Sequence, residues 1–199
     1  MSIEGRKVEL FFRSIPRLAS EIEAARKGQF RRSINALHVV GFLSTILISY
    51  ATYTRPLWDP DGHLKKLVES AFPYPEALRE KMISTFLTEA KLALIHAAKV
   101  RSVNDVGHLM GLYARANMAW LLVLFAVNRR YPVIDKGGRR LVAGFPQIPD
   151  NFDFRTKAIF RAAAAGDLPG GLAEANRLHA EVAALTRTEV VAPAEANPV

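Results

Sequence analysis

The chain has 199 residues, half of them hydrophobic, and a formal net charge of +8. It contains no cysteine, which excludes disulfides, thiolate metal sites and a cysteine nucleophile, and makes a reducing cytoplasm the natural location. This length predicts one domain, or one domain and a fragment, and the positive charge permits an anionic partner such as a nucleotide, a nucleic acid or a membrane surface.

The N-terminal segment predicts a β-strand over residues 7–12. In a strand, Val8, Leu10 and Phe12 share one face, and Glu9 and Phe11 share the other. A carboxylate in an apolar strand is costly unless it is paired, solvated or bound to a metal, so Glu9 is either an exposed edge residue or a functional one. A lone strand cannot satisfy its own hydrogen bonds, which suggests that this one belongs to a sheet completed elsewhere.

Apolar spacing, capping residues and breakers predict helices along the rest of the chain. These helices cover residues 16–26, 43–54, 62–71, 75–100, 105–130, 153–164 and 172–190, with a shorter helical piece between Gly137 and Pro146. Asp61 is placed to cap the third of them, and Asn104 or Asp105 to cap the fifth. The two longest helices each carry an apolar stripe and are expected to form the antiparallel centre of a bundle.

The expected fold is therefore mainly α: a helical bundle with a short N-terminal β-strand. We divide the chain into a remnant of a second domain at residues 1–32, the helical bundle at 33–191 and a disordered tail at 192–199. Residues 33–54 carry no Asp, Glu, Lys or Arg, but they are too polar for a membrane span, and the more apolar residues 117–128 fall short of the roughly 20 that a span needs.

Several segments, in this order, resemble the second half of a bacterial nucleotidyltransferase-like family. They are Gly-Arg-Lys-Val-Glu-Leu-Phe-Phe-Arg-Ser at 5–14, Ser-Thr-Ile-Leu at 44–47, Arg-Pro-Leu-Trp-Asp-Pro-Asp-Gly at 55–62 and Leu-Phe-Ala-Val-Asn-Arg-Arg-Tyr at 124–131, followed by Lys136 and Phe145-Pro146. The family belongs to the DNA polymerase β-like superfamily, and the similarity runs over about residues 5–163. Its kanamycin and aminoglycoside nucleotidyltransferases have a comparable helical C-terminal domain.

The resemblance implies Mg²⁺-dependent transfer of a nucleotidyl group from a nucleoside triphosphate such as ATP to a hydroxyl of a small-molecule acceptor. In the superfamily three carboxylates on a small sheet hold the metal, and Glu9 matches the third of them, where aspartate is usual. The Gly-Ser turn and the Asp-x-Asp pair that supply the rest are missing from this chain. Activity would therefore require an N-terminal nucleotidyltransferase half to supply them. A second copy of this chain, in a homo-oligomer, is the other partner that we consider.

The resemblance also points to residues of the helical part. Glu89 is the candidate general base, with a solvated helix carboxylate as the plainer interpretation. Asn128, Arg129 and Lys136, around the end of the second long helix, are candidates for binding the nucleotide or the acceptor. Cations there also suit the helix dipole, which is the structural alternative.

Two other classes of function remain open. The chain fits a non-catalytic interaction module that uses a bundle groove and an unpaired strand edge. Arg101 and His108 also faintly resemble the Arg-x6-His motif of HEPN-like ribonucleases. A motif this short more often arises by chance. Binding to nucleic acid has no further support in the sequence, and a membrane role is the least favoured.

Overall fold

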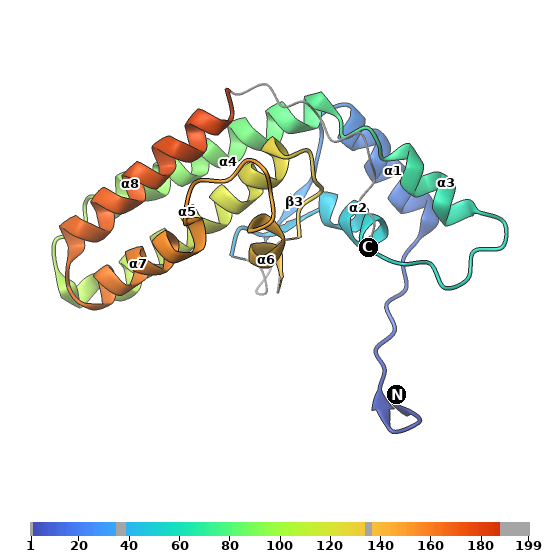
Figure 1. The fold of residues 1–199 in the computed structure, drawn as a ribbon, viewed down its shortest axis with the longest axis horizontal. Coiled ribbons are helices and arrows are strands. Elements are labelled where there is room, and N and C mark those ends of the chain that lie inside the picture. The colour runs from blue at the N-terminus through green and yellow to red at the C-terminus, as the bar shows by residue number, and fades with distance from the viewer. Residues whose placement is uncertain (1, 35–38, 134–136, 188–199) are drawn as a thin grey trace.

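The computed structural model describes residues 2–34, 39–133 and 137–187. Over these residues the protein is mainly helical, as predicted, with two small antiparallel sheets (Figure 1). The helices are α1 (Ile15–Arg26), α2 (Thr45–Thr52), α3 (His63–Ser70), α4 (Glu76–Ala97), α5 (Val106–Val127), α6 (Gly138–Val142), α7 (Phe152–Ala164) and α8 (Leu168–Leu185), with a 3₁₀ turn, η1 (Val103–Asp105), before α5. The strands are β1 (Ser2–Ile3), β2 (Arg6–Lys7), β3 (Arg32–Ser33) and β4 (Phe42–Leu43).

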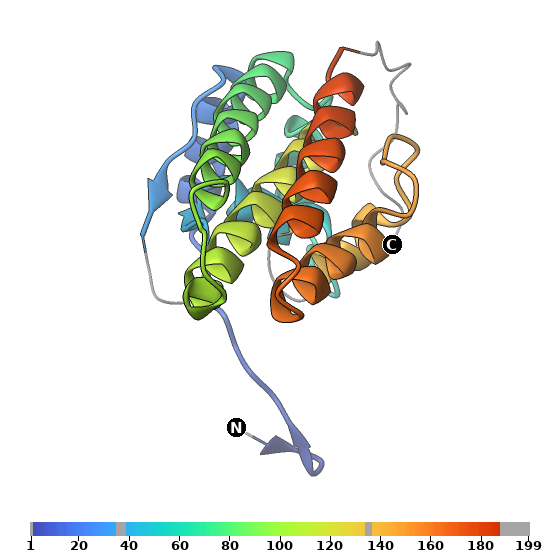
Figure 2. The same ribbon diagram turned by 90° about the vertical axis from the view of Figure 1, so that its left-hand side faces the viewer.

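The centre of the fold is the hairpin of α4 and α5. These two helices lie side by side along most of their length, and α7 and α8 form a second hairpin against them (Figures 1 and 2). Helix α8 contacts both α4 and α5, whereas α7 contacts α5. The prediction that the two long helices form the antiparallel centre of a bundle is therefore confirmed.

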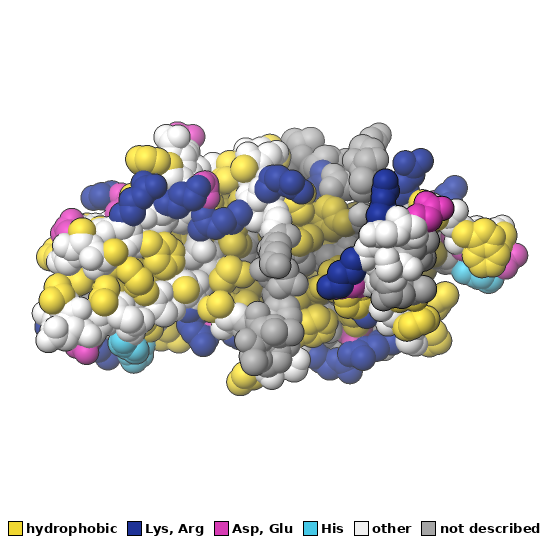
Figure 3. Space-filling view, turned by 90° about the horizontal axis from the view of Figure 1, so that it is seen from below, with side chains coloured by type: hydrophobic (Ala, Val, Ile, Leu, Met, Phe, Trp, Pro, Cys, Tyr) yellow, Lys and Arg dark blue, Asp and Glu magenta, His cyan; other side chains and the backbone are white. Residues whose placement is uncertain are grey.

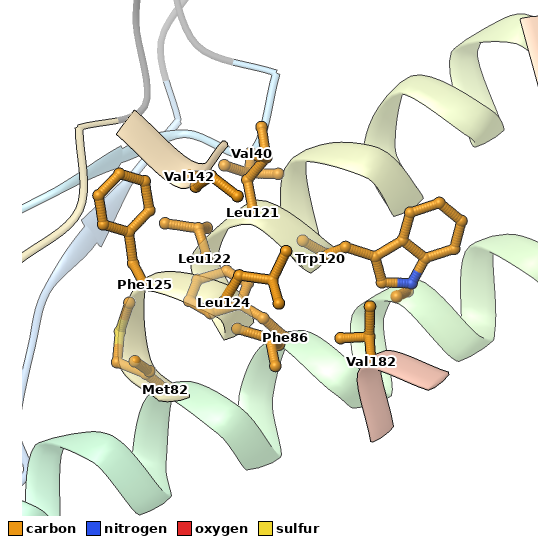
Figure 4. Close-up of a cluster of buried hydrophobic side chains, with 14 of the residues drawn as sticks. Val40, Met82, Phe86, Trp120, Leu121, Leu122, Leu124, Phe125, Val142 and Val182 are labelled. Carbon is orange, nitrogen blue, oxygen red and sulfur yellow. The ribbon is translucent and has the colours of Figure 1, made fainter. Parts of the chain in front are cut away.

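The C-terminal half of helix α5 carries much of the core because it is covered on all sides. Every residue from 119 to 127 is buried. Figure 4 shows Trp120, Leu122 and Phe125 of α5 among side chains from several other elements. Those neighbours include Met82 and Phe86 from α4, Val142 from α6 and Val182 from α8. A helix enclosed in this way must be apolar around its whole circumference.

This burial accounts for the apolar composition of α5. The segment Val103–Val127 is long and apolar enough to cross a membrane by length and composition, but 67% of its most apolar window is buried inside the protein. The core helix of a bundle has the same composition. The hydrophobicity of α5 is thus explained by the helices that cover it.

Helices α1, α2 and α3 close the other end of the molecule. Helix α1 contacts α2, α3 and α4, and its buried Leu18, Ile22 and Ala25 belong to the same core as the bundle. The division that we placed between residues 32 and 33 falls inside β3, which pairs with β4. The tail expected at 192–199 lies outside the described residues.

The predicted strand over residues 7–12 is wrong. Strand structure ends at Lys7, because β1 and β2 pair only with each other in a tight hairpin that turns through Glu4 and Gly5 at positive φ. Residues 9–14 continue as extended chain with no strand beside them in the described part of the protein. The β-forming side chains of this segment give a preference, but a strand also needs a neighbour.

Two predicted helix caps are not made by the expected side chains, although Asp105 does occupy the N-cap position of α5. At α3 it is Asp59, rather than Asp61, whose carboxylate accepts hydrogen bonds from the backbone N–H groups of Leu64 (3.3 Å) and Lys65 (3.0 Å). These amides, that of Lys65 first, lower the pKa of the Asp59 carboxyl. Before α5 the capping side chain is that of Ser102, because the chain enters through a 3₁₀ turn that starts earlier than the apolar stripe indicates.

Candidate functional site

Glu9 lies on the extended segment between β2 and α1, which we call the N-terminal arm (residues 8–13). The arm projects from the helical body, with the β1–β2 hairpin at its far end (Figure 1). The Glu9 side chain is exposed, and its Oε1 lies 3.2 Å from Nζ of Lys7. A single exposed carboxylate with a lysine partner is no Mg²⁺ site, since this ion prefers several oxygen ligands in octahedral geometry.

The described residues hold no group of three or more His, Asp or Glu side chains that could bind a metal ion. Glu9 would therefore need carboxylates from another chain or segment before it could act as a metal ligand. The described residues alone therefore do not fit the metal that the resemblance implies.

Glu89 lies on α4 and is largely enclosed, with 13% of its side chain exposed. Both of its oxygens accept hydrogen bonds from Arg32, at 2.6 and 3.0 Å, and Oε1 also accepts one from Arg115 at 2.8 Å. Arg32 lies over the ring of Phe86, 5.8 Å from its centroid. Charge-assisted bonds of this kind are stronger than those between neutral groups, and here they occupy the carboxylate oxygens. In this arrangement Glu89 ties β3 and α5 to α4.

Asn128 is buried at the end of α5, and its side chain is bonded to the backbone of the protein. Its side-chain nitrogen donates to the carbonyl oxygens of Leu124 and Gln147, each at 2.8 Å, and its Oδ1 accepts from the backbone N–H of Gln147 at 3.1 Å. These three bonds fasten the end of α5 to the loop that follows α6. They occupy the amide group, so a ligand would have to displace them.

Arg129 follows Asn128 with a positive φ of 52°. The N–H of Arg130 donates to the carbonyl of Phe125, so Arg129 occupies the left-handed position of a Schellman motif, where glycine is usual. Its Nη2 lies 3.1 Å from Oε2 of Glu76, and its Nη1 is buried without an acceptor among the described residues. Lys136, the remaining candidate, lies outside the described residues.

The structure does not bring these candidates together. Arg129 contacts Glu76, whereas Glu89 lies thirteen residues further along the same helix, about 20 Å away at the rise of an α-helix. Glu9 is on the arm, outside the bundle. Arg101 and His108, the residues of the ribonuclease alternative, are both exposed, one before η1 and the other on α5.

A polar cluster between α5, α6 and α7 was missed by the sequence analysis. The guanidinium of Arg139 donates to Oδ1 of the buried Asn117 (3.0 Å), to the hydroxyl of the buried Thr156 (3.0 Å) and to the carboxylate of Asp153. Hydrogen bonds from Lys157, and next from Arg139, lower the pKa of Asp153. Asn117, a polar residue inside an apolar helix, is the signal that could have pointed to this cluster.

A second missed contact joins α5 to α8. The indole Nε1 of Trp120 donates to Nδ1 of His179 at 3.2 Å, which leaves the imidazole proton of the neutral form on Nε2. Burial, and to a smaller extent the charge of Lys91, lower the pKa of His179. The side chain is thus held neutral as a hydrogen-bond acceptor.

No family model matches the chain, and no curated protein or solved structure is significantly similar to it.

Proposed function

We propose that the chain is the helical part of a two-part nucleotidyltransferase-like protein. The observation that carries the proposal is the arm, which holds Glu9 outside the bundle and exposes Leu10, Phe11 and Phe12 to water. Apolar side chains gathered on a projecting segment indicate a surface that another part of a protein covers. The resemblance described above supplies the chemistry of that other part.

In the joined protein, Mg²⁺ and a nucleoside triphosphate would be held mainly by carboxylates of the other half, with Glu9 as a further ligand. The reaction class is transfer of a nucleotidyl group to a hydroxyl of a small-molecule acceptor, with the helical bundle beside the acceptor. Arg129 and Lys136 remain the candidates for meeting phosphate, and Glu89 for the base. The proposal places the protein in the cytoplasm, where nucleotides are available and a chain without cysteine needs no disulfide.

The test is nucleotide incorporation by the protein joined to its other half. That half would be found from the intact mass of the cellular protein and the coding DNA before Met1. Glu9→Gln should lower incorporation at least about 100-fold, since even outer partners of a metal ligand typically contribute 10–100-fold. Glu23→Gln, an equally exposed carboxylate on α1, is the matched control and should leave the rate unchanged. Full activity in Glu9→Gln would remove Glu9 from the metal site.

A second candidate, a non-catalytic interaction module, is favoured by the contacts of the helical candidates. Glu89, Asn128 and Arg129 all take part in bonds that join elements of the fold. If the joined protein binds its partner but incorporates no nucleotide, this second function is the correct one.

A further inference from the structure

The N-terminal arm is extended and has two different faces. Lys7 and Glu9 contact each other, and the guanidinium of Arg13 lies over the ring of Phe11, 5.4 Å from its centroid. Contacts between residues two apart show that the odd-numbered side chains share one face, as in a β-strand. Leu10 and Phe12 then belong to the opposite face, which is apolar.

The arm exposes most of its apolar surface. Leu10, Phe11 and Phe12 are 63%, 72% and 89% exposed, and none of them belongs to the core. Figures 1 and 2 both show the arm leading away from the helices. Covering these side chains would be favourable in proportion to the apolar area removed from water.

Within the described part of the chain, the arm has no strand pairing between Glu9 and Arg13. In the described part of the chain, the backbone from Glu9 to Arg13 makes one hydrogen bond. The Phe12 carbonyl accepts it from the side chain of Arg13. Unpaired N–H and C=O groups on an extended segment are a template for pairing with another strand. The arm thus offers both the backbone groups and the alternating side chains that strand addition requires.

The direction of the arm is set where it meets α1. The Ser14 hydroxyl caps α1 by accepting from the N–H of Arg17 at 3.3 Å, and Pro16 lies in the first turn. Arg13 also lies over the ring of Tyr50 on α2, 5.4 Å from its centroid. Two helices therefore hold the base of the arm, and its free part starts at a fixed place on the bundle.

We infer that the arm adds as a β-strand to the open edge of a β-sheet in a partner polypeptide. This inference rests on the proposed function, in which the chain works joined to another part. The partner must offer an apolar surface to Leu10 and Phe12 on one face of the strand. On the other face it must leave Glu9 in a polar environment.

Other occupants fit these observations less well. A lipid surface could cover Leu10 and Phe12, but it would leave the backbone N–H and C=O groups of the extended arm without partners, whereas a sheet edge pairs them. A single-stranded nucleic acid stacks on aromatic rings but gains little from Leu10. A second copy would repel the first, because each carries a net charge of +8. Lys and Arg side chains border the apolar patches on the face from which the arm extends (Figure 3).

The test is photo-crosslinking of the full-length protein in cells that produce it. Benzoylphenylalanine at position 11 should give adducts with one partner protein, mapped to a strand at the edge of a sheet. The same probe at Phe154, exposed on α7, serves as the background. Adducts with lipid, with nucleic acid or with a second copy of this chain would overturn the inference, as would a yield no higher than that at Phe154.

A pair of double variants tests the faces of the strand. Leu10→Ser with Phe12→Ser should lower the adduct yield about tenfold or more, because two apolar anchors are lost. Leu92→Ser with Ile95→Ser removes two exposed apolar side chains from α4 and should change the yield less than about twofold. Equal effects of the two double variants would contradict strand addition.

The outcome is separable from that of the proposed function. Adducts at a sheet edge without nucleotide incorporation would leave the docking correct and the chemistry wrong. Incorporation without adducts at the arm would show the reverse.

Discussion

At the residue scale, the hydrogen bond from Trp120 to His179 makes the stability of the fold depend on pH. The folded pKa of His179 is below its ordinary value of 6.5, so the unfolded chain takes up a proton at higher pH than the folded chain. Stability from this contact is fully present above about pH 6.5 and is lost as the pH falls through that value toward the folded pKa. We expect the urea midpoint of unfolding to decrease between pH 7 and pH 5.5.

Two glutamine variants isolate this effect. His179→Gln keeps an acceptor for the indole N–H but does not titrate, so its midpoint should vary less over the same range. His96→Gln, at an exposed position in the last turn of α4, should keep the wild-type dependence. If wild type and His179→Gln respond alike to pH, the contact is not the source of the effect.

The candidate residues show how far single positions can be interpreted from sequence. Glu89 stood out as a carboxylate on a long helix, but its partners Arg32 and Arg115 come from other elements. Arg32 is 57 positions away from Glu89 in the chain, and a local sequence pattern cannot predict a contact between residues so far apart. Asn128 was singled out by the resemblance and by its place at the end of the second long helix, and the structure shows it buried there with bonds to the backbone.

At the scale of elements, glycine marks where α1 meets α4. Gly28 ends α1 with φ of 69°, and a β-carbon there would lie 2.7 Å from the carbonyl oxygen of Ala77. Gly62 has nearly the same φ, 65°, but nothing within 4 Å of that position. A left-handed conformation costs an alanine about 1–2 kcal/mol at either site, and the clash at Gly28 adds about 1–3 kcal/mol.

We therefore expect Gly28→Ala to destabilise the protein by at least about 1 kcal/mol more than Gly62→Ala. Urea unfolding of both variants measures the difference in the free energy of unfolding. Equal losses would mean that α1 does not approach α4 as closely as the structure shows.

The helices were predictable as elements, whereas the strand was not. The apolar stripes of α4 and α5 repeat at helical spacing, so their existence and pairing followed from the sequence alone. Their ends differed by a few residues, because a 3₁₀ turn and a Schellman motif depend on local geometry. The segment after Lys7 has strand-forming residues, but no strand of the described chain pairs with residues 9–13.

At the scale of the whole molecule, the arm and the bundle are separate in energetic terms. Leu10, Phe11 and Phe12 contribute nothing to the core, which α1 enters through Leu18 and the residues after it. The sequence indicated a mainly helical fold with strand-forming residues at the start, but only the three-dimensional arrangement shows that these residues leave the bundle. The apolar side chains of a segment can pack into the core of their own chain or be covered by a partner, and composition does not distinguish the two cases.

Deletion of residues 2–12, with Arg13 kept over Tyr50 and Ser14 kept as the cap of α1, should therefore leave the free energy of unfolding unchanged within about 0.5 kcal/mol. Leu18→Ala removes a buried side chain from the same helix and should cost about 2 kcal/mol or more in the same urea titration. That contrast would show that the apolar arm is dispensable for folding and available for a partner. A loss on deletion comparable to that of Leu18→Ala would mean that the arm packs on its own bundle, and strand addition to a partner would lose its basis.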